Sequence, residues 1–415
     1  MKPAVTETLL AQALTLPCGA VIPNRLAKSA MSEALGTLDN QPTSRLDRLY
    51  ARWADGGIGL CISGNVMVDR RALGEPGNVA IESEAQLPAL RAWAAAGTRG
   101  GTQLWMQINH PGKQAPKGLN AETVSPSAIP FRADMASFFD TPRELTHAEI
   151  EDIVRRFGNT ARIAKLAGFT GVQIHGAHGY LVSQFLSPHH NRREDQWGGS
   201  PEARRRFLMA VYTEMRRQVG DAFPIGIKLN SADFQRGGFT EEESLATIQM
   251  LADAGIDLVE ISGGTYEAPA MTGMDVKDST RQREAYFLEF AEKVRARIKV
   301  PLMLTGGFRS LGGMRAALAS GAIDLVGLGR LLAVEPELPQ RLLAGQEPTQ
   351  VIRPISTGIG VVDRMALMEV AWYTRQLRRI GDGGEPRPNE SGLTAFLLGI
   401  VESGWKTFRT RRLRA

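Results

Sequence analysis

Short runs of apolar and β-branched residues alternate along most of the chain with longer stretches in which apolar residues recur every three or four positions. The first pattern is typical of buried strands and the second of amphipathic helices. Eight strand-like runs occur, at Leu26 to Met31, Ile58 to Ile62, Gln103 to Ile108, Gly171 to Ile174, Ile225 to Leu229, Leu258 to Ile261, Leu302 to Leu304 and Leu325 to Leu328. Because strands that alternate with helices form parallel sheets, these eight units predict an α/β fold, a closed (β/α)8 TIM barrel. An open doubly wound sheet is the alternative.

Local signals mark where several helices begin. The capping signals are Thr146 followed by Glu149, Thr240 followed by Glu243, and Ser200 followed by Pro201. After Thr146 the apolar residues from Ile150 to Ala164 recur at helical spacing, which predicts one buried face. The longest interruption of the pattern runs from Pro111 to Arg143, and loops of that length inside a domain usually act as functional lids.

The βα alternation stops near Gln346. We therefore expect a barrel domain over residues 1–345 and a helical C-terminal extension over residues 346–415. Apolar residues of the extension fall at helical spacing at Val361, Met365, Met368 and Trp372, and again at Leu393, Phe396, Leu397, Ile400, Val401, Trp405 and Phe408. Such stripes must be buried, so we expect them to pack on the barrel or on a partner subunit of a homo-oligomer. Disorder, or a peripheral membrane contact through the arginines from Arg409 to Arg414, are the alternatives.

Composition narrows the class of protein. Hydrophobic residues make up 43% and charged residues 22% of the 415 residues, which is ordinary for a globular protein. Cys18 and Cys61 are the only cysteines, and their spacing excludes an iron–sulfur cluster, a cysteine-rich zinc site and a disulfide-stapled fold. No leader or bilayer-spanning run is visible. We expect a soluble, cytoplasmic protein.

The net charge of +5 resides at the C-terminal end of the chain. Residues 1–347 contain 38 basic and 38 acidic side chains. A nucleic-acid-binding face would need clustered basic residues, so the composition gives no support to a nucleic-acid partner.

Candidate chemistry lies where the predicted strands end, because barrel active sites form at the carboxyl ends of the strands. Gly306 and Gly307 follow the seventh strand, and Gly329 and Arg330 follow the eighth. Glycine backbone and a guanidinium are suited to hold a phosphate, and barrels commonly bind phosphate at these two strands. The alternative is that the glycines only make tight turns.

The fourth strand ends in His175, His178 and Tyr180. We expect no metal there, because a catalytic zinc would need a third His or carboxylate ligand and none is evident. Two imidazoles beside a phenol fit better as hydrogen-bond donors to a carbonyl or nitro oxygen, with Tyr180 as a proton source. The alternative is that one of the two is a buried structural histidine.

Together these segments resemble the Old Yellow Enzyme family of FMN-dependent oxidoreductases over roughly the first 335 residues. The resembling segments are Asn24 to Met31, Gln107 to Gly112, Pro142 to Thr146, His175 to Pro188, Asn191 to Ser200, and Gly329 with Arg330. Their order along the chain is specific, although each alone is weak.

The resemblance implies a cofactor site built from matching positions. Ala30, Met31 and Ser32 would lie against the isoalloxazine ring of FMN, with Gly64 beside it, and Gly306, Gly307, Gly329 and Arg330 would hold its phosphate. Gln107 and Lys228 would bind the pyrimidine edge, where the lysine stabilises negative charge on reduction. Ser32 stands where similar proteins commonly have Thr or Cys, and Lys228 where Arg is frequent.

The resemblance also implies a reaction. His175 and His178 would polarise the substrate and Tyr180 would protonate it, while NAD(P)H re-reduces the flavin in the same cavity in a ping-pong cycle. The expected enzyme is therefore an NAD(P)H-dependent ene-reductase or related acceptor oxidoreductase. A lyase or isomerase that anchors a phosphorylated substrate, with Lys228 as its strand-end lysine, is the alternative, and an idle binding scaffold is a third possibility.

Overall fold

The computed structural model describes residues 9–265, 284–352, 355–358, 367–399 and 401. Eight parallel strands form its centre: β3 (Leu26–Lys28), β4 (Leu60–Ile62), β7 (Gln103–Asn109), β10 (Gly171–Gly176), β11 (Ile225–Asn230), β12 (Leu258–Ser262), β13 (Leu302–Thr305) and β14 (Leu325–Leu328). Each pairs with the next, and β14 pairs with β3, so the sheet closes on itself. The predicted TIM barrel and all eight strand positions are confirmed.

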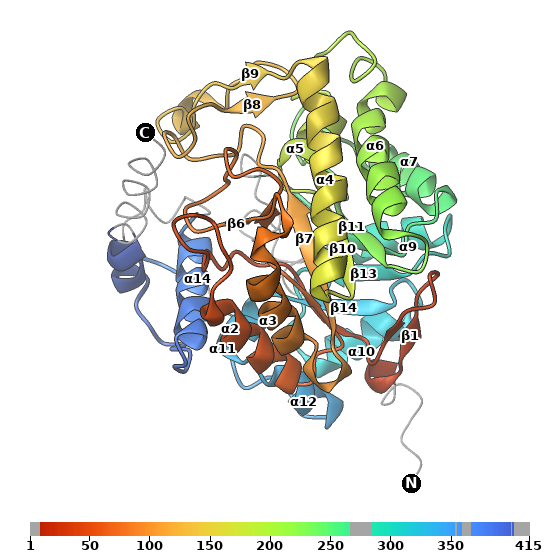
Figure 1. The fold of residues 1–415 in the computed structure, drawn as a ribbon. Helices are drawn as coiled ribbons and strands as arrows, with labels where there is room; N and C mark the ends of the chain where they lie inside the picture. The colour runs from red at the N-terminus through yellow and green to blue at the C-terminus, as the bar shows by residue number, and fades with distance from the viewer. Residues whose placement is uncertain (1–8, 266–283, 353–354, 359–366, 400, 402–415) are drawn as a thin grey trace.

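Helices cover the outside of the barrel (Figure 1). They are α2 (Ser44–Asp55), α3 (Leu87–Gly97), α4 (His147–Ala167), α5 (Leu181–Leu186), α6 (Pro201–Val219), α7 (Glu241–Asp253), α9 (Leu288–Arg295), α10 (Leu311–Ala319), α11 (Arg330–Val334) and α12 (Leu338–Leu343). Both predicted capping boxes are present, and Ser200 caps α6. In α4 the predicted apolar face is buried, apart from a partly exposed Val154.

The barrel interior is apolar at the amino end of the strands. A short hairpin of β1 (Leu14–Thr15) and β2 (Val21–Ile22) packs into this layer. The buried residues of the apolar layer are Leu14, Leu16, Ile22, Ala27, Leu60, Ile62, Trp105, Leu258, Met303 and Leu325. Since this layer fills the lower half of the barrel, chemistry is restricted to the opposite, carboxyl end.

The predicted lid from Pro111 to Arg143 is a packed segment. A strand from its middle, β8 (Val124–Ser125), pairs with β9 (Arg143–Glu144) at its end to form a two-stranded parallel sheet, which lies beside the start of α4 in Figure 1. Lys113 ties the segment down: its buried ammonium donates to the carbonyl of Ile129 at 3.1 Å and lies 4.4 Å from the centre of the Phe131 ring.

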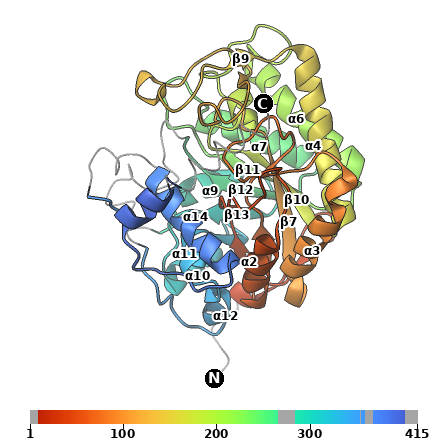
Figure 2. The ribbon, with the colours of Figure 1, turned by 60° about the vertical axis from the view of Figure 1, so that its left-hand side comes forward.

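Within the described part of the C-terminal extension, one helix packs on the barrel. Helix α14 (Leu367–Gly381) lies against α2 and α11 (Figure 2), where Trp372, Leu377 and Ile380 are buried. Residues 392–399 are helical, and this stripe is only partly covered: Ala395 is buried, whereas Leu397 is 55% exposed. Val361, Met365, Trp405, Phe408 and the terminal arginines lie outside the described residues. Among the helices that are described, none is long and apolar enough to cross a bilayer.

Candidate active site

A buried polar layer crosses the barrel directly above its apolar half. Glu260 of β12 is at its centre and accepts hydrogen bonds from Gln173 at 2.7 Å and from Thr305 at 2.7 Å. Lys228 of β11 lies 3.0 Å from the same carboxylate, and Gln107 donates to Gln173 at 2.8 Å. The sheet register places these residues side by side on neighbouring strands. Gln107 and Lys228, both predicted as cofactor-binding residues, are thus held by carboxylate and amide partners that the sequence analysis missed.

His175, His178 and Tyr180 come together as predicted at the end of β10. The ring centres of the two histidines are 5.3 Å apart, and those of His175 and Tyr180 are 4.7 Å apart. His178 has a φ of 61°, followed by Gly179 at 79°, and this left-handed turn carries the second imidazole over the strand end. Ser262 of β12 lies 2.8 Å from His178 Nε2.

Both imidazoles are held neutral. Burial lowers the pKa of His175 and His178 well below the usual value, and the positive charge of Lys228 lowers it further. The backbone N–H of Ala177 donates to Nδ1 of His175 at 3.3 Å, which places the single ring proton on Nε2. His175 therefore presents an N–H donor, the property needed to stabilise charge on an oxygen atom.

The segment after β3 is fixed by a buried charge cluster. The carboxylate of Glu33 accepts hydrogen bonds from the Tyr50 phenol and from the backbone of Gly64, and Lys28 lies 3.8 Å from it. A side chain at position 64 would collide with Glu33 and with the carbonyl of Met31, so this close approach requires glycine. The cluster thus sets the spacing between Gly64 and the residues Ala30, Met31 and Ser32, which are all partly exposed.

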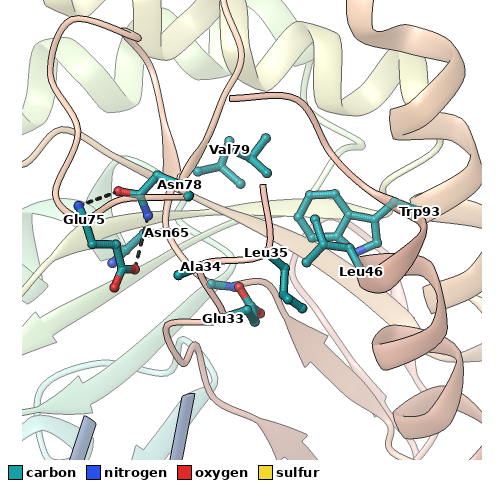
Figure 3. Close-up of a pocket in the computed structure, with 12 residues that line it drawn as sticks. Glu33, Ala34, Leu35, Leu46, Asn65, Glu75, Asn78, Val79 and Trp93 are labelled. Carbon is teal, nitrogen blue, oxygen red and sulfur yellow. Dashed lines mark hydrogen bonds between the residues drawn. The ribbon is translucent and has the colours of Figure 1, made fainter. Parts of the chain in front are cut away.

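A small pocket lies behind this segment, as Figure 3 shows. Its lining includes Leu46 of α2 and Trp93 of α3 on the side of the outer helices, and Gly64 and Asn65 on the side of the barrel mouth. Glu75 and Asn78 bond to each other on one side of it. Glu75 also accepts a hydrogen bond from the hydroxyl of Ser32.

The residues of the predicted phosphate site lie at the ends of β13 and β14, and Arg330 has a partner that the sequence did not indicate. Gly306 and Gly307 have φ angles of 126° and 90°; a Cβ at Gly307 would lie 2.9 Å from the Tyr286 ring, whereas one at Gly329 would meet only the Met31 sulfur at 3.9 Å. Packing against Tyr286 is thus one reason for glycine at position 307, and it leaves open whether the backbone there also binds a ligand, while the backbone at Gly329 has room for one. Arg330 donates to Glu369 of α14 at 2.7 Å.

Nearby helix-terminal N–H groups are already bonded. Glu284 accepts from the backbone of Arg309 and Ser310, at 3.0 and 3.1 Å, and Glu347 accepts from Leu311 at 2.7 Å. These two carboxylates therefore occupy the backbone donors of Arg309, Ser310 and Leu311 at the start of α10. Among the described residues, no three His, Cys, Asp or Glu side chains are placed to hold a metal ion.

Comparison with known proteins identifies the family. The sequence model of the NADH:flavin oxidoreductase / NADH oxidase family matches residues 18–348. The chain belongs to this family. As an NADH:flavin oxidoreductase it is an enzyme with FMN as cofactor and NAD(P)H as reductant, which confirms the resemblance to Old Yellow Enzyme. The lyase and scaffold alternatives are thereby set aside.

Individual relatives of this NADH:flavin oxidoreductase support the same family assignment. It is 37% identical over 411 residues to the NADH-dependent flavin oxidoreductase iccE of Talaromyces variabilis, covering 90% of this chain and 99% of that protein. An NADH oxidase of Thermoanaerobacter brockii is 34% identical over 82% of this chain, which spans about half (52%) of that longer protein. Among solved structures, morphinone reductase superposes with a TM-score of 0.68 at 26% identity, covering 83% of this chain and 91% of that one.

The residues at the barrel mouth fit FMN. A cofactor with a polar pyrimidine edge and a phosphate needs hydrogen-bonding groups and a cation at one end and an anion site at the other. Gln107 and Lys228 would supply the first set, and the open backbone at Gly329 with the partly exposed Arg330 would supply the second. No carboxylate other than Glu369 is recorded within salt-bridge distance of Arg330 in the described part of the chain.

Proposed function

We propose that this NADH:flavin oxidoreductase reduces an activated alkene, or a related electron-poor acceptor, in a ping-pong cycle. FMN, when bound, supplies hydride to the electron-poor carbon. The observation that carries the proposal is the cluster of His175, His178 and Tyr180 at the mouth of the barrel, with both imidazoles neutral. The description of the iccE protein as NADH-dependent supports NADH as the reductant.

The imidazoles bind and polarise the acceptor. Hydride addition to an alkene conjugated with a carbonyl or nitro group places negative charge on the oxygen atom, and preorganised N–H donors stabilise that charge. Nε2 of His175 carries such a proton. When Ser262 donates to Nε2 of His178, the proton of that ring lies on Nδ1, so each imidazole offers one donor.

Tyr180 then gives its phenolic proton to the α-carbon of the acceptor. Its ring is buried against His175, which fixes the phenol relative to the imidazoles. General acid catalysis of this kind contributes roughly 10²–10⁴-fold to rate.

For the cofactor we propose the positions implied by the family. Ala30, Met31, Ser32 and Gly64 contact the ring system, Gln107 and Lys228 bind its pyrimidine edge, and Gly306, Gly307, Gly329 and Arg330 hold the phosphate. This arrangement draws support from the common edge of the barrel that all ten positions share. We further propose a cytoplasmic homo-oligomer, with the barrel at residues 1–345 and the extension at 346–415.

The substitution Tyr180→Phe tests the reaction. Flavin content and flavin reduction by NADH should be nearly unchanged, while stopped-flow reoxidation by cyclohexenone should slow by about 10²–10⁴-fold. As a matched control, Tyr212→Phe removes a phenol of the outer helix α6 that bonds the Ala254 carbonyl and should leave both half-reactions intact. Unchanged reoxidation of the Tyr180→Phe enzyme would remove Tyr180 from the mechanism.

A further inference from the structure

Two asparagines beside Tyr180 were not singled out by the sequence. Asn65 follows Gly64 and leads into β5 (Val66–Met67), and Asn109 ends β7. Strand β5 pairs in parallel with β7, and the backbone N–H of Val68 donates to the carbonyl of Asn109 at 3.1 Å. Backbone hydrogen bonds thus fix the two asparagines next to each other.

Their side chains form a chain of hydrogen bonds that ends at the phenol. Nδ2 of Asn109 donates to Oδ1 of Asn65 at 3.2 Å, and Nδ2 of Asn65 donates to the phenolic oxygen of Tyr180 at 3.4 Å. Asn109 is almost fully buried, and Asn65 and Tyr180 are at most partly exposed. Since the carbonyl oxygen of Asn65 accepts a hydrogen bond from Asn109, the NH2 group of Asn65 faces Tyr180.

The direction of the last hydrogen bond matters for proton transfer. A phenol oxygen that accepts a hydrogen bond keeps its own proton for another acceptor. An N–H donor also stabilises the phenolate that remains once the proton has left. A hydrogen-bond acceptor in the same place would instead bind the phenolic proton that has to be transferred, and it would destabilise the phenolate.

We propose that Asn65, oriented by Asn109, is a positioning residue that directs the proton of Tyr180 toward the acceptor and stabilises the phenolate formed. This inference rests on the proposed role of Tyr180 as proton donor. Asn65 acts on the reaction only through the phenol, so its contribution must vanish when the phenol is absent.

A double-mutant cycle tests this dependence. Asn65→Ala, Tyr180→Phe and the double variant are compared in the FMN-loaded enzyme by stopped-flow, with NADH reduction and cyclohexenone reoxidation measured separately. In the Tyr180 background, Asn65→Ala should lower the limiting reoxidation rate about tenfold, the effect of about 1.4 kcal/mol, and raise the solvent deuterium isotope effect. The half-saturating enone concentration and the rate of reduction by NADH should stay within about twofold.

In the Tyr180→Phe background the same change should have less than about twofold effect. Equal slowing in both backgrounds, or no slowing with Tyr180 present, would overturn the inference. A Tyr180→Phe enzyme that reoxidises at the normal rate would instead overturn the proposed proton donor, so the two failures are distinguishable.

Two further variants guard against misfolding. Asn65→Asp keeps the shape but replaces the donor by an acceptor, and it should slow reoxidation at least as much as Asn65→Ala; a normal rate would contradict the assigned direction of the hydrogen bond. Asn120→Ala is the matched control: Asn120 bonds the backbone of Leu73, at 3.0 and 2.9 Å, outside the chain that reaches Tyr180, and its loss should not change reoxidation.

Discussion

In the proposed cofactor site Arg330 has two partners, Glu369 and the phosphate of FMN. One nitrogen donates to Glu369, while the side chain as a whole stays 29% exposed at the barrel mouth. The guanidinium has five N–H groups, so its pairing with Glu369 leaves donors for a phosphate. The carboxylate thus sets the direction in which the remaining donors point.

Replacing Arg330 should therefore weaken cofactor binding. Arg330→Ala removes a charge-assisted hydrogen bond of about 1.5–3 kcal/mol, and the dissociation constant for FMN should rise by roughly 10- to 100-fold, measured by fluorescence of released flavin after dilution. Arg330→Lys keeps the charge but loses the planar guanidinium group, so its dissociation constant for FMN should lie between those of the unchanged enzyme and of Arg330→Ala. Full flavin occupancy in Arg330→Ala would place the phosphate elsewhere.

At the residue scale, motif positions were predictable from the sequence but their partners were not. His175, His178 and Tyr180 are three neighbours on one strand end, so the sequence already brings them together. Glu369 meets Arg330 across 39 positions, and Glu260 meets Gln173 across 87. Such pairings depend on how the barrel closes. A charged residue inside an apolar strand, as at Glu260, is nevertheless a signal of an inward-facing polar group that could have been noted.

The polar layer across the strands should tune the potential of the cofactor. Glu260 partly neutralises Lys228, the cation proposed to stabilise reduced FMN. Glu260→Gln keeps the size of the side chain, replaces one of its two acceptor oxygens by an NH2 donor and removes its negative charge, so the midpoint potential should rise, on the order of tens of millivolts for an interaction of about 1–2 kcal/mol.

A spectroelectrochemical titration measures that potential directly. Glu214→Gln, at an ion pair on the outer surface of α6, provides the control and should leave the potential unchanged. An unchanged or lower potential in Glu260→Gln would argue that Lys228 does not act on the flavin.

At the scale of elements, long patterns were predicted well and short ones were missed. Each barrel strand is an apolar run, and four of the helices between these runs, α4, α6, α7 and α10, begin at a side-chain cap; this repetition identifies the strands. Strands β5, β6 (Val79–Ala80), β8 and β9 have two residues each, too few for any period to show. These strands form because the backbone of a neighbouring segment is available for hydrogen bonding. Among them, β5 determines the position of Asn65.

The whole molecule should lose stability in mild acid. Burial lowers the pKa of His110 to about 4 and holds the pKa values of His175, His178 and His190 well below the usual value. A lowered pKa in the folded state means that the stabilisation is present above about pH 6.5 and is lost as the pH falls, because only the unfolded chain then takes up protons.

At pH 5.5 this loss is about 1.4 kcal/mol for each such histidine. Glu33 and Asp233, whose pKa values burial raises, act in the opposite direction, so the net loss is smaller than the sum. Thermal unfolding of the FMN-loaded enzyme at pH 8.0, 6.5 and 5.5 should show a progressively lower midpoint. A midpoint that stays constant or rises toward pH 5.5 would contradict the buried neutral state.

Removing the end of the extension should change the association of the protein. Leu397, Leu398 and Val401 are exposed apolar residues of the last described helix, and deleting the chain after Asp382 removes them while α14 stays. We expect light scattering to show a different number of subunits per particle, and we expect the FMN content per subunit to be unchanged. An unchanged mass would count against a subunit interface, and salt-sensitive sedimentation of the full-length protein with anionic vesicles would favour the lipid alternative.

Helix α14 spans the place where the barrel closes. Glu369 holds Arg330, which follows the last strand, and Thr374 donates to the carbonyl of Ser32 at 2.8 Å, which follows the first. A chain leaving the ribosome exposes its N-terminal segments first, yet both ends of the proposed cofactor cradle depend on a helix that follows the whole barrel in the sequence. If the proposed cradle is correct, a nascent chain that has completed the barrel but not α14 would lack a firm hold on its flavin.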